Sequence, residues 1–151
     1  VKCWGYGYSY KLGNNECYNT TINPIFMQKF NMPSNMLKQS NTYTIALTED
    51  NKLWWCGYNS QWSRSIYYME EYDGELPPEK IIDLRAGTNN YAVLTEDHKI
   101  YIQGYCNGYH LEDGNQKSKL WHKERPNELE EKVSAWDVGY DYPVYVTGTG
   151  K

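Results

Sequence analysis

The end of the sequence carries the segment that most resembles a phosphate-binding loop, Gly148-Thr149-Gly150-Lys151. In such a loop, another glycine stands five positions before the second glycine of this segment, and a serine or threonine follows the lysine. Tyr145 occupies the first of those positions, and Lys151 is the last residue given. The segment therefore favours a hairpin turn over a nucleotide site.

Zinc ligation is a second possibility, because Cys106, His110 and His122 lie in one stretch of the sequence. A structural zinc site needs four ligands, and C-x-x-C or H-x-x-x-H pairs usually provide them. Neither spacing is present, and the G-x-S-x-G motif of serine hydrolases is also absent from the sequence. We therefore expect no catalytic residue, no metal ion and no cofactor, and we predict that the protein is not an enzyme.

Residues 67–75 are a better candidate for function, because they combine tyrosines and a methionine with acidic side chains. Tyrosine and methionine are enriched at protein interfaces, whereas acidic residues are depleted at interface cores and lie at the rim. We expect this segment to be a loop that binds a protein partner. The candidate contact residues are Tyr68, Glu70, Glu71, Tyr72 and Asp73.

A second candidate segment, residues 117–125, is basic and contains a tryptophan. Basic side chains interleaved with an aromatic ring can bind phosphate groups or an acidic protein face. Two other interpretations stay open: a solvated loop that packs Trp121 onto the protein, or two oppositely charged loops that attract each other. The candidate contact residues are Lys119, Trp121, Lys123 and Arg125.

The composition indicates a β-rich protein. The 151 residues include 16 Tyr and 6 Trp, which favour strands and need a polar partner for one end of the ring. The formal charge of −4 argues against broad nucleic-acid binding, and no apolar run reaches the roughly 20 residues of a membrane span. The four cysteines form no C-x-x-C pair, which favours free thiols and an intracellular location, cytoplasmic or nuclear.

The sequence repeats itself. Residues 44–53 return as residues 91–100, with Leu-Thr-Glu-Asp-x-Lys in common, and residues 143–151 are a more divergent third copy. A second block contains Gly5, Gly57 and Gly104, so the repeat is roughly 50 residues long. Repeats of this length that consist of strands are typical of propeller blades.

The shared Glu-Asp turn is flanked by short runs of β-branched and aromatic residues, which predict β-hairpins. The third turn residue is Asn51 in one copy and His98 in the next, and both residue types are enriched in the left-handed conformation that such turns need. The predicted strands are 45–48, 92–95 and 144–146, with Leu47, Leu94 and Val146 buried at equivalent positions.

These blocks resemble the repeats of the regulator of chromosome condensation family, whose pattern reads G-x-x-H-T-L-A-L-T-x-D-G-x-V-Y-x-W-G-x-N-x-x-G-Q-L-G. The resemblance covers nearly the whole chain outside two or three long loops, and residues 40–59 match the pattern most closely. Ser40 replaces a leading glycine, and Cys56 and Gln103 replace the tryptophan of W-G. The resemblance assigns structural roles to Trp4, Gly5, Leu12, Gly13, Leu47, Gly57, Gly87, Leu94, Gly104 and Gly139.

The resemblance implies an all-β fold, since family members are typically seven-bladed propellers in which each sequence repeat crosses a blade boundary. We expect a partial β-propeller of about three four-stranded blades, with the N-terminal strand in register to follow the C-terminus. The chain is then either part of a longer propeller, or copies of it complete one another. We predict one repeat module, 1–151, with repeat blocks around 1–13, 37–65, 84–114 and 133–151 and inter-repeat loops at 14–36, 66–83 and 115–132.

Three functions are compatible with these observations. We favour a non-enzymatic scaffold that binds a protein partner through the inter-repeat loops. The resemblance implies an alternative, a guanine-nucleotide exchange factor or regulator for a Ran-type small GTPase, and a secreted inhibitor or lectin-like propeller is the third. The expected partners are proteins, either further propeller repeats, a second copy of the chain or a small GTPase, and not a membrane or a nucleic acid.

Overall fold

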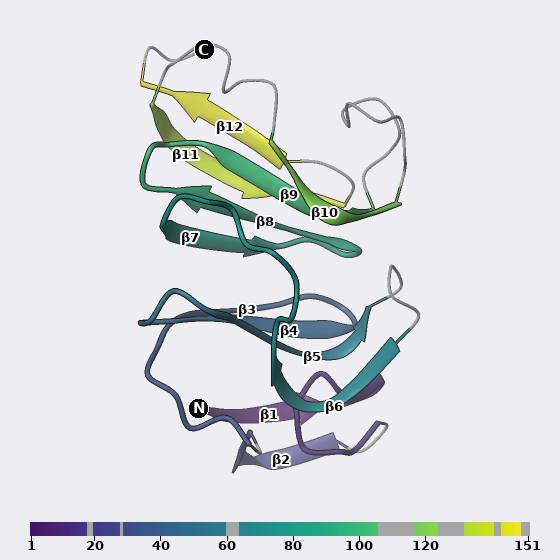
Figure 1. Cartoon of the computed structure of the whole chain (residues 1–151). Helices are drawn as coiled ribbons and strands as arrows, with labels where there is room; N and C mark the ends of the chain where they lie inside the picture. Colours follow the sequence, from purple (N-terminus) through teal and green to yellow (C-terminus); the bar gives the residue numbers. More distant parts are fainter. Residues whose placement is uncertain are drawn as a thin grey trace. The chain divides into compact units, whose positions relative to one another are not determined.

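The structure is a computed structural model that describes residues 1–17, 20–27, 29–59, 64–105, 117–123, 132–140 and 143–148 (Figure 1). Within these residues, the regular elements are β-strands and a short 3₁₀ helix, η1 (Tyr8–Tyr10). None of the described residues belongs to a helix that is long and apolar enough to cross a membrane.

The chain forms two compact units, Val1–Asp73 and Gly74–Lys151. The first unit contains β1 (Lys2–Tyr6), β2 (Thr20–Phe26), β3 (Ser34–Gln39), β4 (Tyr43–Thr48), β5 (Leu53–Asn59) and β6 (Arg64–Glu71). The second contains β7 (Ile81–Ala86), β8 (Asn90–Thr95), β9 (Ile100–Tyr105), β10 (Lys117–Lys123), β11 (Val133–Val138) and β12 (Pro143–Thr147).

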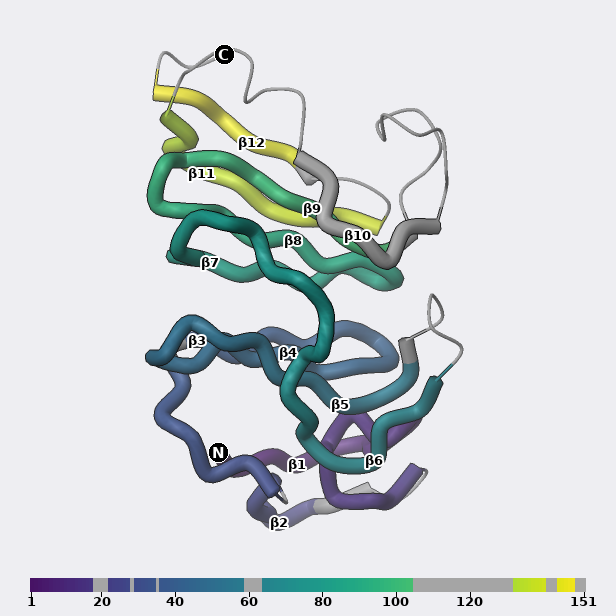
Figure 2. The backbone as a smooth tube through the Cα atoms, in the orientation of Figure 1, coloured from purple at the N-terminus to yellow at the C-terminus, as the bar shows by residue number. Residues whose placement is uncertain are grey.

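Each unit holds one four-stranded and one two-stranded antiparallel sheet. The first unit has the sheets β3-β4-β5-β6 and β1-β2, and the second has β7-β8-β9-β10 and β11-β12. Every pairing joins strands that follow each other in the sequence, as the gradual change of colour along β3 to β6 shows in Figure 2. The four-stranded sheets confirm the predicted strand number of a blade.

The Leu-Thr-Glu-Asp-x-Lys block forms the turn between the second and third strands of each four-stranded sheet. Thr48 donates to the carbonyl of Lys52 from its backbone N–H at 2.9 Å and from its hydroxyl at 3.0 Å. Thr95 and Lys99 make the same two bonds at 2.9 and 3.0 Å. Asn51 adopts the left-handed conformation, with φ of 64°, which asparagine tolerates better than most residues. The predicted hairpins are therefore confirmed, together with their turn chemistry.

Three equivalent glycines share one backbone conformation, and two of them also allow close contact between strands. Gly5, Gly57 and Gly104 have φ of 103°, 108° and 111°, a backbone conformation that side chains other than glycine rarely adopt. A Cβ added at Gly57 would lie 2.6 Å from the Cα of Tyr43, and one added at Gly104 would lie 2.8 Å from the Cα of Asn90. At Gly5 an added Cβ would meet no described atom within 4 Å. Gly57 and Gly104 thus need to be glycine for two reasons: their φ disfavours other residues, and the backbone of the neighbouring strand leaves no room for a side chain.

The second strand of each four-stranded sheet is buried along its whole length. Leu47 and Leu94 are 2% and 7% exposed, which confirms their predicted burial. The prediction was wrong for Val146, which is 45% exposed. Val146 lies on the same face of β12 as Val144, and no described side chain covers that face. In contrast, β4 and β8 lie between two strands of a four-stranded sheet and are covered on both faces.

The segments predicted to be inter-repeat loops contain strands. The range 14–36 includes β2, the range 66–83 begins with all but the first two residues of β6, and the range 115–132 includes β10. In the four-stranded sheets, the outer strands β6 and β10 each pair with one neighbour. Their side chains are therefore less constrained, and their sequences do not repeat from one sheet to the next. The organisation of residues 1–151 as one repeat module stays a prediction.

Candidate protein-docking surface

The acidic and aromatic segment lies mainly on β6, the outer strand of the sheet in the first unit. Among the described strands, β6 pairs only with β5. Its side chains alternate in exposure: Ile66 and Met69 are buried in the core, whereas Tyr67 is 47% exposed. We define the β6 surface as the accessible side chains of this strand and the residues after it: Tyr67, Tyr68, Glu70, Glu71 and Asp73.

Two ion pairs fix the acidic side chains of the β6 surface. Arg64 Nη2 lies 2.9 Å from Glu70 Oε2, and Lys52 Nζ lies 2.9 Å from Glu71 Oε1. The hydrogen bond with Glu71 raises the pKa of Lys52 above its ordinary value. All four side chains are about half exposed, so these pairs orient the groups and contribute little to stability. Asp73 belongs to no ion pair in the described part of the chain, so its charge is available to a partner.

Aromatic contacts give this surface an ordered centre. The rings of Tyr10 and Tyr67 meet edge to face, with centroids 4.6 Å apart. Lys29 Nζ lies 4.3 Å from the centroid of the Tyr68 ring, a cation–π contact. Sequence reasoning missed Tyr10 and Lys29, since they are distant from β6 in the sequence and no motif marks them. The surface therefore combines tyrosine rings with both signs of charge.

The remaining predicted contact residues are placed as follows. Tyr72 is buried, so we leave it out of the β6 surface, because it offers little area to a partner. Lys119, Trp121 and Lys123 lie on β10, which pairs with β9 as β6 pairs with β5. Arg125 lies outside the described residues. The two candidate segments therefore include equivalent outer strands, one in each unit.

Two of the described thiols, those of Cys3 and Cys56, are unsuited to nucleophilic chemistry. Cys3, Cys17 and Cys56 are free, and burial raises the pKa of Cys56 and of Cys3. A reactive cysteine needs the opposite shift, because the thiolate is the nucleophile.

The described residues contain no group of three or more His, Cys, Asp or Glu side chains that could hold a metal ion. Of the residues considered as ligands or phosphate contacts, His122 lies on β10, whereas Cys106, His110 and 149–151 fall outside the described residues.

A charged network in the second unit surrounds the β8–β9 turn. Lys99 Nζ contacts Asp97 and lies 3.3 Å from Glu79 Oε1, and the Tyr101 hydroxyl donates to Glu79 Oε2 at 2.9 Å. The hydrogen bonds with Asp97 and Glu79 raise the pKa of Lys99 to about 12. Burial, together with the bond to Glu79, raises the pKa of Tyr101 to about 12. Both groups thus hold their protons more tightly in the folded chain.

This network predicts alkaline destabilisation. Unfolded lysine and tyrosine lose their protons near their ordinary pKa values of 10.5 and 10.0, whereas folded Lys99 and Tyr101 keep theirs to about 12. The folded state therefore binds more protons in this window, so the free energy of unfolding falls as pH rises from about 10 to 12. Urea unfolding at a series of pH values should show a shallower fall for Tyr101→Phe than for the wild type. The control variant Tyr140→Phe, which removes an exposed hydroxyl, should keep the wild-type slope; equal slopes in all three would contradict the argument.

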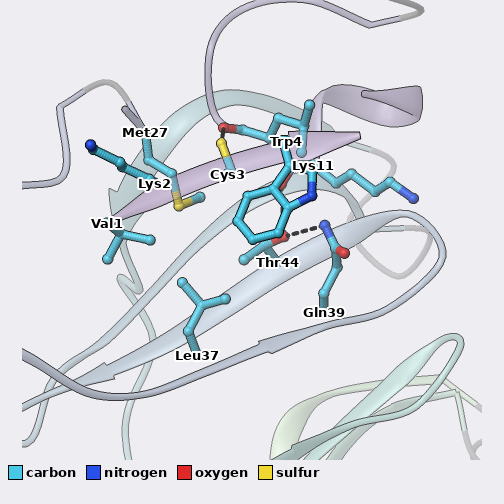
Figure 3. A pocket seen from close by; sticks show the side chains of 10 residues that line it. Val1, Lys2, Cys3, Trp4, Lys11, Met27, Leu37, Gln39 and Thr44 are labelled. Carbon is cyan, nitrogen blue, oxygen red and sulfur yellow. Dashed lines mark hydrogen bonds between the residues drawn. The ribbon is translucent and has the colours of Figure 1, made fainter. Parts of the chain in front are cut away.

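Each unit has an apolar hollow beside its two-stranded sheet. In the first unit, a cavity of about 220 Å³ lies between β1 and the β3–β4 pair, and we call it the β1 cavity (Figure 3). Trp4, Leu37 and Thr44 line it, and Gln39 Nε2 donates to Thr44 Oγ1 at 3.3 Å across its floor. In the second unit, a hollow of about 300 Å³ is lined by Ala135, Trp136, Asp137, Val144, Tyr145 and Val146.

Comparison with known proteins identifies relatives in structure. No protein-family model matches the sequence, and a search of curated proteins found no match. The structure of human WBSCR16 superposes with a TM-score of 0.80 and 17% identity, over 99% of this chain and 41% of that one. Prp20p from Saccharomyces cerevisiae, whose structure was described with its binding properties to Gsp1p and histones, superposes with a TM-score of 0.71 and 11% identity. That match covers 95% of this chain and 38% of Prp20p. A chain in the structure of Kap60 bound to yeast RCC1 (Prp20) superposes with a TM-score of 0.70 and 18% identity. That match covers 99% of this chain and 38% of the other.

These similarities show the fold of the chain. It is all-β and has the architecture of an RCC1-type β-propeller, so the predicted resemblance to the regulator of chromosome condensation repeats is confirmed at the level of fold. The chain spans between 38% and 41% of the length of the structures that it matches. It therefore corresponds to part of such a propeller, as the number of repeats predicted.

Proposed function

We propose that the chain is a non-enzymatic propeller-repeat scaffold that binds a protein partner. The observation that carries the proposal is the β6 surface, where exposed Tyr67 and half-buried Tyr68 lie beside paired and unpaired charges. Tyrosine is enriched among the residues that contribute most to protein binding, and charged groups at the rim set the orientation of the partner. We propose the basic segment, which includes Lys119, Trp121 and Lys123, as a separate contact region in the second unit.

A regulator of a Ran-type small GTPase is the second candidate function. The support is the similarity in fold to Prp20p, a protein whose structure was described with its binding to Gsp1p and histones. In this candidate the protein partner is a small GTPase, and the chain promotes nucleotide release by binding it. Further propeller repeats and a second copy of the chain are the other proposed partners, and an intracellular location is part of the proposal, supported by the free thiols of Cys3, Cys17 and Cys56.

The proposal predicts that the tyrosines of the β6 surface dominate binding. The double variant Tyr67→Ala, Tyr68→Ala should weaken the complex at least about tenfold, since the loss of one interface hot spot exceeds about 1.4 kcal/mol. Partners captured from a cell extract by the wild-type chain would be identified by mass spectrometry, and their dissociation constants would then be measured by calorimetry. Tyr140→Ala, which removes an exposed tyrosine of the second unit, is the matched control and should bind as the wild type does.

The basic segment of the second unit is tested separately. The triple variant Lys119→Glu, Lys123→Glu, Arg125→Glu should weaken binding and slow association, because charges at an interface steer the partner. Its urea midpoint should stay close to that of the wild type. If the identified partner binds both this variant and the tyrosine variant with wild-type affinity, the contacts lie elsewhere and the proposed surface is incorrect.

Nucleotide release separates the two candidate functions. A Ran-type GTPase loaded with a fluorescent guanine nucleotide would be mixed with an excess of the chain, and the release rate would be followed. A scaffold leaves this rate unchanged, whereas an exchange factor accelerates it. Acceleration that the tyrosine variant abolishes would establish the second candidate and place its contacts on the β6 surface.

A further inference from the structure

A third apolar pocket lies in the first unit, where the segment after β2 meets the start of β5. We call it the Trp54 pocket, and its volume is about 520 Å³. This volume lies within the range of about 300–1,000 Å³ that is typical of ligand sites, so the pocket has room for a large side chain. Its apolar walls are Phe26, Met27, Phe30, Met32 and Trp54, and Lys29 also lines it.

The walls of the Trp54 pocket reach from the core of the unit to its surface. Met27 and Phe30 are 4% and 3% exposed and belong to the same hydrophobic cluster as Met69 of β6. The rings of Phe30 and Trp54 pack together with centroids 5.6 Å apart. Met32 is 39% exposed, and methionine has a flexible side chain that adapts to different apolar groups. The pocket thus combines fixed aromatic walls with an adaptable edge.

Lys29 gives the pocket an uncompensated positive charge. The side chain of Lys29 is exposed, and it belongs to no ion pair in the part of the chain that the structure describes. Its φ of 60° lies in the left-handed region, which a lysine rarely adopts, and strained residues of this kind cluster at functional sites. Among the described residues that line the pocket, Lys29 alone is charged. A carboxylate bound at the pocket would therefore be attracted and not repelled.

The Trp54 pocket is continuous with the β6 surface. Lys29 lines the pocket, and its Nζ also lies 4.3 Å from the centroid of the Tyr68 ring. Trp54 is paired with Glu71 in the β5–β6 ladder. The Glu71 carboxylate is already compensated, since Lys52 Nζ lies 2.9 Å from it. A partner that contacts the tyrosines of the β6 surface can therefore reach the pocket with the same segment.

We propose that the Trp54 pocket receives a large apolar side chain of the protein partner, and that an acidic residue close to it in the partner's sequence pairs with Lys29. The inference rests on the proposed function, because it states the chemistry of the partner at the β6 surface. Apolar and aromatic anchors that fill a pocket contribute most of the binding energy of an interface, whereas charges at its rim set the orientation. The partner segment is thus an acidic one with a bulky apolar anchor.

Selection from a display library of short random peptides tests the proposal, with the whole chain as the bait. We expect the enriched peptides to carry Phe, Leu, Met or Trp, with Asp or Glu next to it or one residue away. In a synthetic copy of an enriched peptide, replacement of the apolar anchor by alanine should weaken binding at least about tenfold, as calorimetry would measure.

An exchange of charges tests the role of Lys29. The variant Lys29→Glu should weaken binding of the acidic peptide about fivefold, since an exposed ion pair contributes modestly and the reversed charge adds repulsion. A peptide with lysine in place of its acidic residue should recover this loss on the variant. Lys38→Glu, on β3 and not among the residues that line the pocket, is the matched control and should bind the acidic peptide as the wild type does.

The indole N–H signal of Trp54 reports where the peptide binds. In two-dimensional nitrogen–proton NMR spectra this signal, assigned with the variant Trp54→Phe, should shift when the peptide is added. The signal of Trp136, in the second unit, is the internal control and should stay in place. A peptide that shifts the Trp54 signal and binds Tyr67→Ala with wild-type affinity would support the pocket and contradict the proposed role of the β6 tyrosines.

Other outcomes would overturn the inference. A peptide that leaves the Trp54 signal unchanged but loses affinity with Tyr67→Ala would do so, while the proposed function would stand. Enrichment of basic peptides, or of none, would also overturn it. A pocket that binds decanoate but no peptide would show that its occupant is a small amphipathic carboxylate and not a segment of a protein.

Discussion

The substitution Gly57→Ala is expected to remove most of the free energy of unfolding of the first unit. The new Cβ would lie 2.6 Å from the Cα of Tyr43 and closer still to the carbonyl oxygen of Thr42, and both are backbone atoms that cannot rotate away. The φ of 108° is a second cost, because an alanine in this conformation is strained by about 1–3 kcal/mol. Overpacking adds about 1–3 kcal/mol, so the total of about 2–6 kcal/mol approaches the whole stability of a small domain.

Gly5→Ala is the matched control for this experiment. Gly5 has nearly the same φ, but its added Cβ would meet no described atom within 4 Å. The control therefore carries the conformational strain without the clash, and the difference between the two urea midpoints isolates the close approach of the strands. If Gly57→Ala and Gly5→Ala destabilise the chain equally, the backbone contact contributes nothing and the register of β4 and β5 needs revision.

Leu47→Ala is expected to destabilise the first unit by about 2–5 kcal/mol, the range for a large-to-small change in a core. Leu47 is 2% exposed on a strand whose two faces are both covered, so the structure can relax only partly around the cavity left behind. Leu94→Ala should have an effect of the same size on the second unit, where Leu94 packs with Ile100 and Ile102. Chemical denaturation followed by tryptophan fluorescence would measure both.

Val146→Ala tests whether repeat position or burial sets the size of the effect. Val146 occupies the place of Leu47 and Leu94 in the sequence repeat, but it is 45% exposed. Its substitution should change the free energy of unfolding by no more than about 0.5 kcal/mol, as other exposed substitutions do. A loss comparable to that of Leu47→Ala would show that β12 is buried within the chain.

The central strands of the sheets could be predicted from the sequence because several local signals agree there. In residues 44–53 the β-branched residues, the Thr-Glu-Asp turn and the buried leucine all favour the same hairpin, and the second copy repeats them. The outer strands were not predicted, since β6 and β10 pair with one neighbour and carry polar side chains typical of loops. Only the requirement of four strands per blade indicates that a strand follows β5 and β9.

The segment that forms the candidate surface could be predicted from the sequence, whereas the contacts between its side chains could not. The composition of residues 67–75 indicated a docking segment, and most of its side chains are accessible. The contacts of Lys29 with Tyr68 and of Tyr10 with Tyr67 depend on where η1 and the segment after β2 lie beside β6, which no local pattern encodes. Tyr72 was assigned to the surface because tyrosine is common at interfaces, whereas the chain turns inward after β6 and buries it.

The pairing of every described strand with its sequence neighbour has a kinetic consequence. Contacts between residues that are close in sequence form quickly, because little loop-closure entropy is lost before they form. Each hairpin can therefore fold soon after its second strand leaves the ribosome, without waiting for the rest of the chain. Refolding of the chain should then be fast, and its rate should stay the same when the protein is diluted.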